Sequence, residues 1–324
     1  MKHIINVCLL VAMLATTSTT VAQAQDYPNR PIRIILATTP GGMLDPFGRL
    51  IGDGLQQAMG QPVLMEHKPG AGGMLGGDLV AASKPDGYTI WLGSVGPLAL
   101  LPAFGKTTYD VDKDFTPVTL LLTTPNVLVV PVTLPVQSIS ELVALAKNTQ
   151  GGLSYASGGV GTSFHLAGEL FRASTGANIT HIPYKGTAVA VADLIAGRVQ
   201  FMFSNVSSVL AHINAGQLRP LAVTAPKRLA LLPQVATTDE IGMKGFYTGG
   251  FLAIMAPAHT PEAIVRRLNL EINKIMTSEV GRKTVAAHAG DDATGSPEDL
   301  AKYLRTERAI WSKVIADNAI PFEF

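Results

Sequence analysis

Short apolar runs of strand type alternate with helix-type patterns along this chain, and this order constrains the fold more than any other feature. An apolar run at 32–37 is followed by a helix pattern and then by a second strand-like run at 62–66. In the helix pattern, apolar residues recur at spacings of three and four: Phe47, Leu50, Ile51, Leu55 and Met59. A helix at 75–82 and a strand at 88–93 repeat the alternation. The sequence therefore predicts an α/β protein with a mostly parallel sheet and helices on both faces.

The segment 115–132 is β-branched and apolar, and it is longer than an ordinary strand of about 5–6 residues. We predict that it belongs to one domain up to Pro125 and continues into a second. The alternation then resumes, with helices at 139–147, 164–173, 188–196 and 206–214 and strands at 153–156, 179–183, 199–203 and 219–224. Ala225-Pro226 marks the expected return to the first domain. A strand-like run at 251–255 and helices that begin at Thr260-Pro261-Glu262 and Ser296-Pro297-Glu298 complete the chain.

This pattern divides the chain into four expected parts. Residues 1–24 are a signal peptide that is cleaved, 25–124 the first part of lobe 1, 125–225 lobe 2, and 226–324 the second part of lobe 1 with the C-terminal helices. Because the chain crosses between the lobes twice, the two crossings are expected to form a hinge.

The N-terminus has the pattern of a secretory signal, because Lys2 precedes an apolar segment at 4–15 and Ala22-Gln23-Ala24 offers a cleavage site. Cys8 is the only cysteine and lies in this leader, so the exported chain is expected to contain no disulfide and no zinc–thiolate site. Lys2 is one of 25 basic residues, and its removal leaves 24 basic and 24 acidic residues. This balance argues against nucleic acid as a partner. We expect a soluble, periplasmic protein.

Several expected strand-to-helix junctions consist of small residues. They are Pro40-Gly41-Gly42, Gly70-Ala71-Gly72-Gly73, Gly93-Ser94-Val95-Gly96 and Ser157-Gly158-Gly159-Val160-Gly161-Thr162-Ser163. In α/β sheets such loops line the ligand crevice, and the helix starts behind them expose unpaired amides that attract an anion. Each loop alone is also explained as a tight turn that needs glycine. Four such loops, spread over both halves of the chain, favour a binding site.

Polar side chains near these loops each have two interpretations. Asp45, which precedes Pro46, is expected to be a helix N-cap, and Arg49 to form an ion pair with it, although Arg49 could also reach the crevice. Lys185 is either a solvated charge or a clamp on the ligand. His165 is either a structural residue at a helix start or a ligand contact. Asn205, at the carboxyl end of a strand, has side-chain donors and acceptors that either contact the ligand or lie outside the site.

The sequence lacks the usual motifs of an enzyme. SGGVGTS has neither the lysine of a phosphate-binding P-loop nor the G-x-G-x-x-G spacing, and neither Ser94 nor Ser157 has the upstream glycine of a nucleophile elbow. His165 and Glu169 are spaced i, i+4, but no third metal ligand is suggested nearby. We therefore predict no catalytic residue and no metal site.

From end to end of the expected mature chain, the sequence resembles the Bug/TctC-like extracytoplasmic solute-binding proteins of tripartite tricarboxylate transporters. The matching motifs, in order, are YPNRPIRII, PGGMLD, GQPVLMEHKPGAGG, PDGYTIWLGS, DFTPV, YASGGVGTSFHLAGELF, HIPYKGT, LRPLAVT and TPEAIVRRLN. The resemblance implies a periplasmic-binding-protein fold of type II-like organisation, in which two doubly wound α/β lobes are joined by a hinge of two crossings. It also implies a monomer without a cofactor that delivers a small carboxylate to membrane transporter subunits.

The resemblance further implies that backbone amides, small hydroxyls and bridging waters hold the ligand carboxylate. The candidate ligand-binding residues are Thr38, Thr39, Gly41, Gly42, Met43, Leu44, Asp45, Ala71, Ser94, Ser157, Gly158, Gly161, Thr162, Ser163, His165 and Asn205. The family commonly has an aromatic residue and a proline where this chain has Thr38 and Thr39. Because this loss of bulk enlarges the site, we hypothesise an aromatic dicarboxylate of terephthalate type, with its ring on Met43 and Leu44. An aliphatic di- or tricarboxylate and an acidic amino acid are the other candidates.

Two further classes of protein remain open at this point. An exported hydrolase would use a serine of the SGGVGTS loop, and it would lose activity on Ser157→Ala. A periplasmic sensory subunit would share the fold and the site but would pass its closed state to a receptor instead of a permease.

Overall fold

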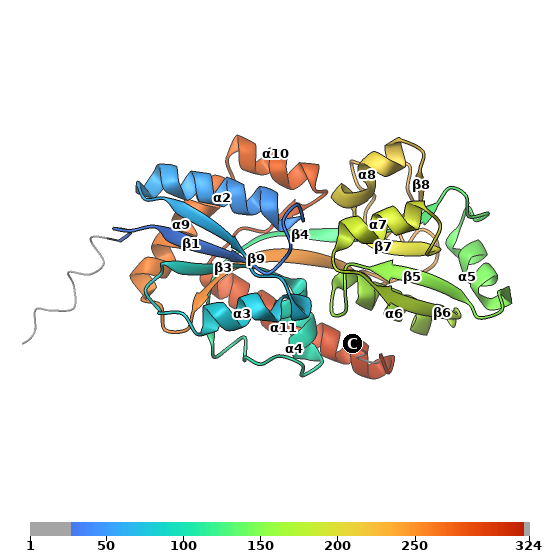
Figure 1. Cartoon of the computed structure of the whole chain (residues 1–324), viewed down its shortest axis with the longest axis horizontal. Helices are drawn as coiled ribbons and strands as arrows, with labels where there is room; N and C mark the ends of the chain where they lie inside the picture. The colour runs from blue at the N-terminus through green and yellow to red at the C-terminus, as the bar shows by residue number, and fades with distance from the viewer. Residues whose placement is uncertain (1–26, 321–324) are drawn as a thin grey trace, which may run out of the picture.

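The computed structural model describes residues 27–320 and shows two α/β lobes joined by two long strands, β4 and β9 (Figure 1). The expected signal peptide lies outside the described residues. Lobe 1 begins with β1 (Ile32–Leu36), α2 (Leu44–Met59), β2 (Val63–His67), η3 (Ala71–Gly73), α3 (Met74–Ala81), β3 (Thr89–Ser94), η4 (Gly96–Leu100) and α4 (Leu101–Ala103). The predicted fold class is confirmed, since strands and helices alternate in the expected order.

The long apolar segment forms one strand, β4 (Phe115–Pro131), as predicted from its length and composition. Its first part pairs antiparallel with β9 (Gly249–Pro257) in lobe 1, up to the pair of Pro125 with Gly249. From Asn126 onward it pairs antiparallel with β7 (Phe201–Asn205) and from Val127 with β8 (Leu218–Val223) in lobe 2. A single strand therefore carries the chain from one lobe into the other.

Parallel pairing is confined to the outer strands of each lobe. The strand order is β2-β1-β3-β9-β4-β7-β5-β6, with β8 and β10 (Asp291–Asp292) paired to β4. Parallel ladders join β1 to β2 and β3, and β5 to β6 and β7. The strands next to the crossing are antiparallel, so the mostly parallel sheet that the alternation predicted is limited to three strands in each lobe.

Lobe 2 repeats the alternation of lobe 1. Its remaining elements are α5 (Ile139–Asn148), β5 (Leu153–Ser157), α6 (Ser163–Thr175), β6 (Ile179–Pro183), α7 (Thr187–Ile195) and α8 (Val206–Asn214). Separate hydrophobic cores lie on the two faces of its sheet, one covered by α5 and α6 and the other by α7 and α8. Lobe 1 is also covered on both faces, by α2 with α9 (Glu262–Met276) and by α3 with α11 (Pro297–Asp317), as Figure 1 shows.

The segment 226–248, which was expected in lobe 1, packs on lobe 2. Leu229, Leu232 and Val235 contact the core of α7 and α8, and Phe246 is part of the core of α5 and α6. The amide of Thr238 also donates to the carbonyl of Val223 at 2.9 Å. We therefore place the return crossing at Gly249, where β9 begins, and not near residue 225 as expected.

Both crossings are held by buried polar bonds at one point. The amide of Asn126 donates to the carbonyl of Thr248 at 3.1 Å and to the hydroxyl of Thr224 at 3.0 Å. The Thr224 hydroxyl in turn lies 2.5 Å from the Thr248 carbonyl. Since all three residues are almost fully buried, these bonds fix the ends of the two crossings relative to each other.

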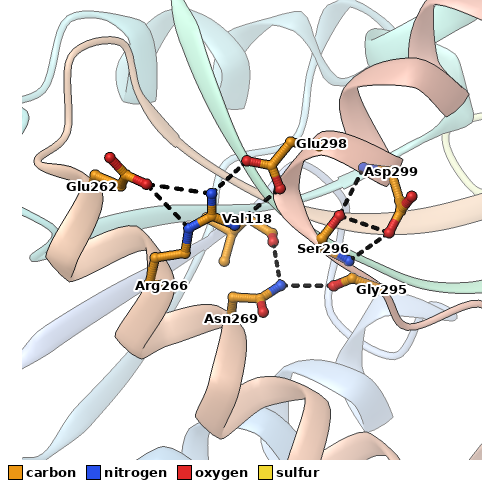
Figure 2. A network of polar contacts seen from close by, with 8 residues as sticks. All are labelled: Val118, Glu262, Arg266, Asn269, Gly295, Ser296, Glu298 and Asp299. Carbon is orange, nitrogen blue, oxygen red and sulfur yellow. Dashed lines mark hydrogen bonds and ion pairs between the residues drawn. The ribbon is translucent and has the colours of Figure 1, made fainter.

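The C-terminal helices are tied to β4 by the polar network in Figure 2. Asn269 on α9 donates to the carbonyls of Val118 at 2.8 Å and Gly295 at 2.7 Å. Ser296 and Asp299 form the capping box of α11, which confirms the helix start predicted there. Arg266 pairs with Glu298 at 2.5 Å and lowers the pKa of that carboxyl to about 2. The network links α9 and the start of α11 to β4.

Two helix starts differ from the sequence prediction. Pro261, not Thr260, is the N-cap of α9, because the Thr260 hydroxyl donates to the carbonyl of Pro257 at 2.7 Å. The helix α10 (Glu279–Ala287) was not predicted, although Ser278 caps it by accepting from the amide of Gly281 at 3.1 Å. Among residues 27–320, no helix is long and apolar enough to cross a membrane.

Candidate ligand-binding site

Two loops of the same kind face the boundary between the lobes. One joins β1 to α2 in lobe 1, and the other joins β5 to α6 in lobe 2. Each follows the carboxyl end of a parallel strand and leads directly into a helix, so backbone N–H groups without helical acceptors lie at both loops. The two loops are held in place by different side chains.

In lobe 1, a carboxylate holds the loop. The amide of Gly41 donates to Oδ2 of Asp45 at 2.7 Å, and the Asp45 side chain is almost fully buried. Asp45 is the second residue of α2, and the N-cap is Met43, so the predicted N-cap role of Asp45 is wrong. The predicted ion pair with Arg49 is absent among the described residues, because Asp45 instead contacts His67.

His67 was not singled out from the sequence. Its Nδ1 lies 3.0 Å from the carbonyl oxygen of Thr38, and its Nε2 lies 3.5 Å from Oδ1 of Asp45. One imidazole therefore touches both ends of the lobe 1 loop. The only sequence signal for it was its place at the end of β2, next to the strand that leads into the loop.

In lobe 2, neutral groups hold the loop. The Ser157 hydroxyl lies 2.6 Å from Nε2 of His181 and accepts from the amide of Gly159 at 3.0 Å. Thr162 is the N-cap of α6 and accepts from the amide of His165 at 3.3 Å. The amide of Gly161 donates to Nδ1 of His165 at 3.3 Å.

The imidazoles of this loop are stacked and uncharged. The rings of His165 and His181 are stacked with centroids 4.2 Å apart, and the rings of Tyr155 and His181 are stacked with centroids 4.9 Å apart. Burial, with a smaller effect of the neighbouring His165 in the same direction, lowers the pKa of His181 to about 3. Burial also lowers the pKa of His165, against the opposing effect of Glu169. Both rings are therefore neutral near pH 7.

His165 accepts from the loop amide of Gly161, which fits the structural interpretation of this residue at the helix start. Glu169 is bound by Tyr155 at 2.8 Å and by Arg172 at 2.7 Å. Within residues 27–320, no group of three His, Cys, Asp or Glu side chains is arranged to hold a metal ion.

Amides without acceptors remain in both loops. Between residues 27 and 320 no protein acceptor is found for the N–H groups of Gly42, Met43, Gly158 and Val160. Two of these precede α2, which has 16 residues, and two precede α6, which has 13. Because helix N-termini carry partial positive charge, each lobe presents one set of donors suited to an anion.

The structure brings loops of the two lobes into contact. A β-carbon built on Gly72 would lie 3.2 Å from the carbonyl oxygen of Val160, and one built on Gly96 would lie 3.0 Å from that of Gly161. A β-carbon on Gly186 would lie 3.5 Å from Oγ1 of Thr39. Ala71 is next to the first of these contacts, and Ser94 ends β3 just before Gly96.

Other predicted residues have their polar groups turned to protein partners or to the core. The amides of Gly41 and Gly161 are bound by Asp45 and His165, as described above. The side chain of Leu44 is packed in the core of lobe 1 under α2, so it offers no surface to a ring. Ser163 and Ser157 are buried.

Asn205 is also buried, and it donates to Ser207 at 3.2 Å. It pairs with Asn126 of β4, so it lies beside the hinge. The two basic candidates, Arg49 and Lys185, are exposed. A groove of 680 Å³ between α2, α9 and α10 lies elsewhere on lobe 1, and none of the predicted ligand residues lines it.

Two α/β lobes, two crossings and facing loops of free amides define the class of two-lobed solute-binding proteins. The model of the tripartite tricarboxylate transporter family receptor (TctC) matches residues 47–320, and the chain belongs to this family. It is 38% identical over 309 residues to a protein from a tcbD-tcbE intergenic region of a Pseudomonas species, covering 95% of this chain and 92% of the other. It is also 36% identical over 297 residues to BugT of Bordetella pertussis, covering 91% of each.

Solved structures agree with this assignment. An R. palustris protein with adipate superposes with a TM-score of 0.86 at 34% identity, covering 91% of this chain and 99% of the other. MatC from Rhodopseudomonas palustris with bound malate gives a TM-score of 0.84 at 29% identity, covering 89% and 100%. The resemblance noted in the sequence motifs is therefore confirmed at the level of family and fold.

Proposed function

We propose that this protein binds a small dicarboxylate between its lobes in the periplasm and delivers it to the membrane subunits of a tripartite tricarboxylate transporter. The observation that supports this most directly is the pair of free amide sets, one before α2 and one before α6. A ligand with two carboxylates can meet both sets at once, and so it stabilises the closed arrangement of the lobes.

The electrostatics of the site fit an anion that is bound without a charged partner. Arg49 and Lys185 are exposed, and the donors nearest the lobe boundary are backbone amides. Each helix N-terminus has a partial charge of about +0.5. Two of the similar solved structures contain dicarboxylates, adipate in one and malate in the other, and this supports the same ligand class here.

Within this class, we propose an aromatic dicarboxylate of terephthalate type. Thr38 and Thr39 supply two short side chains where the family commonly has an aromatic residue and a proline. The hydroxyl of Thr38 is buried and has no protein partner among the described residues. Met43 is half-buried beside the loop and remains the apolar surface for a ring, since Leu44 is in the core.

Mass spectrometry of the ligand released from purified protein, followed by calorimetry, tests this proposal. We expect micromolar or tighter binding of at least one acid among adipate, malate, terephthalate and phthalate, without turnover. Tight binding of citrate or glutamate, with none of benzoate, the phthalates or terephthalate, would contradict the aromatic proposal but not the binding function. Binding of no carboxylate would contradict the function itself. Gel filtration should give a monomer.

A hydrolase is the second candidate, and one contact favours it: the Ser157 hydroxyl lies 2.6 Å from Nε2 of His181. A general base works best with a pKa near the working pH. The pKa of His181 is lowered to about 3, and the Ser157 hydroxyl also donates to the carbonyl of Gly159 at 3.0 Å. These features suit a rigid loop better than a nucleophile. Ester turnover that Ser157→Ala abolishes would reverse this assignment.

A sensory role is compatible with the same fold and site. Deletion of the gene separates the two roles, because loss of a transport receptor abolishes uptake of the bound acid, whereas loss of a sensory subunit abolishes only the response to it.

A further inference from the structure

The lobes meet along a short boundary formed by main-chain atoms. On the lobe 1 side lie Gly72 and Gly96, and on the lobe 2 side the carbonyl groups of Val160 and Gly161. We call these four residues, together with Leu101, the seam. Because a β-carbon on Gly96 would lie only 3.0 Å from the Gly161 carbonyl oxygen, the backbones approach as closely as glycine permits.

Leu101 fills the seam from lobe 1. Its side chain is 1% exposed, yet it belongs to none of the four hydrophobic cores of the described chain. Its methyl carbons lie 3.0 Å from a β-carbon built on Gly72 and 2.5 Å from one built on Gly161. The Gly161 backbone of the opposite lobe therefore covers Leu101, and separation of the lobes would uncover it.

We propose that Gly96 and Leu101 set how readily the lobes close, by contacting the opposite lobe and not the ligand. Burial of Leu101 favours the closed state, and the missing side chain of Gly96 removes the steric obstacle to it. The apparent dissociation constant of a ligand equals its intrinsic value divided by the fraction of closed protein. Affinity is thereby tuned by Gly96 and Leu101, which are not among the groups proposed to recognise the acid.

Gly96 allows a selective test of the closed state. Its φ is not in the left-handed region, unlike those of Gly72 (+64°) and Gly161 (+76°), so alanine fits its backbone. Within lobe 1, the nearest atom to the added β-carbon is the carbonyl oxygen of Gly72 at 3.5 Å, an ordinary contact. The close contact of Gly96→Ala is with lobe 2 alone. The variant should fold normally and close poorly.

Gly52→Ala is the matched control. Gly52 is a buried glycine in α2 of lobe 1, and an added β-carbon meets only the Val63 side chain of the same lobe at 3.7 Å. The control introduces the same methyl group into the same lobe without touching lobe 2. It should leave lobe closure and ligand affinity unchanged.

Spin labels on opposite lobes measure closure directly. Leu64 in lobe 1 and Val189 in lobe 2 are 50% and 54% exposed, and Cys8 in the expected leader is the only native cysteine, so Leu64→Cys with Val189→Cys gives two defined label sites. We expect Gly96→Ala to shift the interlobe distance distribution toward longer values, both without ligand and with saturating adipate. The Gly52→Ala protein should match the unmodified sequence. Identical distributions for Gly96→Ala and the unmodified sequence in both conditions would overturn the proposal.

Variants of Leu101 provide a second readout. We expect Leu101→Ala to weaken adipate binding about tenfold, because the closed state loses most of a buried side chain, and Leu101→Met to restore most of the affinity because it conserves volume. Only the adipate affinities of the Leu101 variants and the interlobe distances measured with adipate rest on the proposed function. If adipate fails to bind the unmodified protein, the choice of ligand fails, and the ligand-free distributions still decide the role of the seam. Equal adipate affinity in Leu101→Ala and the unmodified protein would remove Leu101 from the seam mechanism.

Discussion

The loops that lead into α2 and α6 occupy equivalent places in the two lobes, but opposite chemistry holds them. In lobe 1 a buried carboxylate, Asp45, binds the loop amide of Gly41 and contacts His67. In lobe 2 a serine, a threonine and neutral histidines do the same work. Both loops have the same requirement: side chains must hold the backbone in place while some of its amides stay free to bind a ligand.

The difference has a consequence for an anionic ligand. A carboxylate beside the free amides of Gly42 and Met43 opposes the partial positive charge at the start of α2. Neutral groups beside Gly158 and Val160 leave the charge at the start of α6 undiminished. We therefore expect lobe 2 to supply the stronger part of the anion site, and the predictions below test this asymmetry.

The largest effect is expected from Gly158→Val. The φ of Gly158 is not left-handed, so strain is modest, but an added β-carbon would lie 3.1 Å from Oγ1 of Thr187 at the start of α7. The branched side chain must therefore shift the loop that carries the free amides. We expect the dissociation constant to rise at least about 100-fold, which corresponds to about 2.7 kcal/mol, with a much smaller change in melting temperature.

The matched variant in lobe 1 is Gly42→Val. Its φ is also outside the left-handed region, and the nearest neighbour of an added β-carbon is the carbonyl oxygen of Thr39 at 3.5 Å. Calorimetry with both variants should give the larger loss for Gly158→Val. A larger loss for Gly42→Val would reverse the asymmetry, and equal affinity to the unmodified protein would remove that glycine from the site.

The stability of the protein should also depend on pH, through His165 and His181. The pKa values of His165 and His181 are lowered in the folded protein, that of His181 to about 3, so the unfolded chain binds more protons below its ordinary histidine pKa of 6.5. The stabilising contribution of the two neutral histidines is therefore complete above about pH 6.5, and it is lost progressively as the pH decreases toward 3. Each histidine contributes at most about 1.4 kcal/mol per pH unit.

Urea unfolding at pH 7 and pH 5 measures this contribution. His181→Gln keeps a polar group for Ser157 but does not titrate, so its stability should depend less on pH than that of the unmodified protein. An unchanged pH dependence would mean that the pKa of His181 is the same in the folded and unfolded chains.

The success and failure of sequence reasoning follow the range of the interactions involved. β4 was predictable because its β-branched composition is a local property, and the start of α11 was predictable because Ser296, Pro297 and Glu298 are consecutive residues. The return at Gly249 was missed because the segment after Ala225 has no periodic pattern and is placed in lobe 2 by scattered contacts such as those of Leu229 and Phe246.

For the site too, features carried by neighbouring residues were predictable, and features that depend on contacts distant in the chain were not. Bare loops at strand ends identified the region, since glycine-rich junctions are visible in the sequence. The groups that fix these loops were not visible, because His181 lies 24 residues from Ser157 and His67 lies 29 residues from Thr38. Leu44 could not be separated from Met43 without the helix register, which turns Leu44 into the core.

The substitution Asp45→Asn removes the negative charge that distinguishes the lobe 1 loop from the lobe 2 loop. The amide oxygen of asparagine can still accept from Gly41, so the loop should keep its shape. Without the negative charge beside the free amides, we expect a dicarboxylate to bind about fivefold more tightly, which corresponds to about 1 kcal/mol. Asp45→Ala is the control, because it removes the charge and the loop bond together. Weaker binding of the Asn variant would show that the carboxylate assists the ligand through His67.

The smallest changes in stability are expected at the two helix caps. Thr162 has the extended backbone of an N-cap and accepts from the amide of His165, whereas Met43 has helical φ and ψ and makes no capping bond. Thr162→Ala should lower the free energy of unfolding by about 0.5–1 kcal/mol, and Thr162→Ser should restore it. Met43→Ser should gain no such stability, because a serine in helical conformation cannot turn its hydroxyl to the first free amides. Thermal unfolding of the three variants decides this, and a stabilised Met43→Ser protein would show that the lobe 1 loop can adopt the capped geometry of lobe 2.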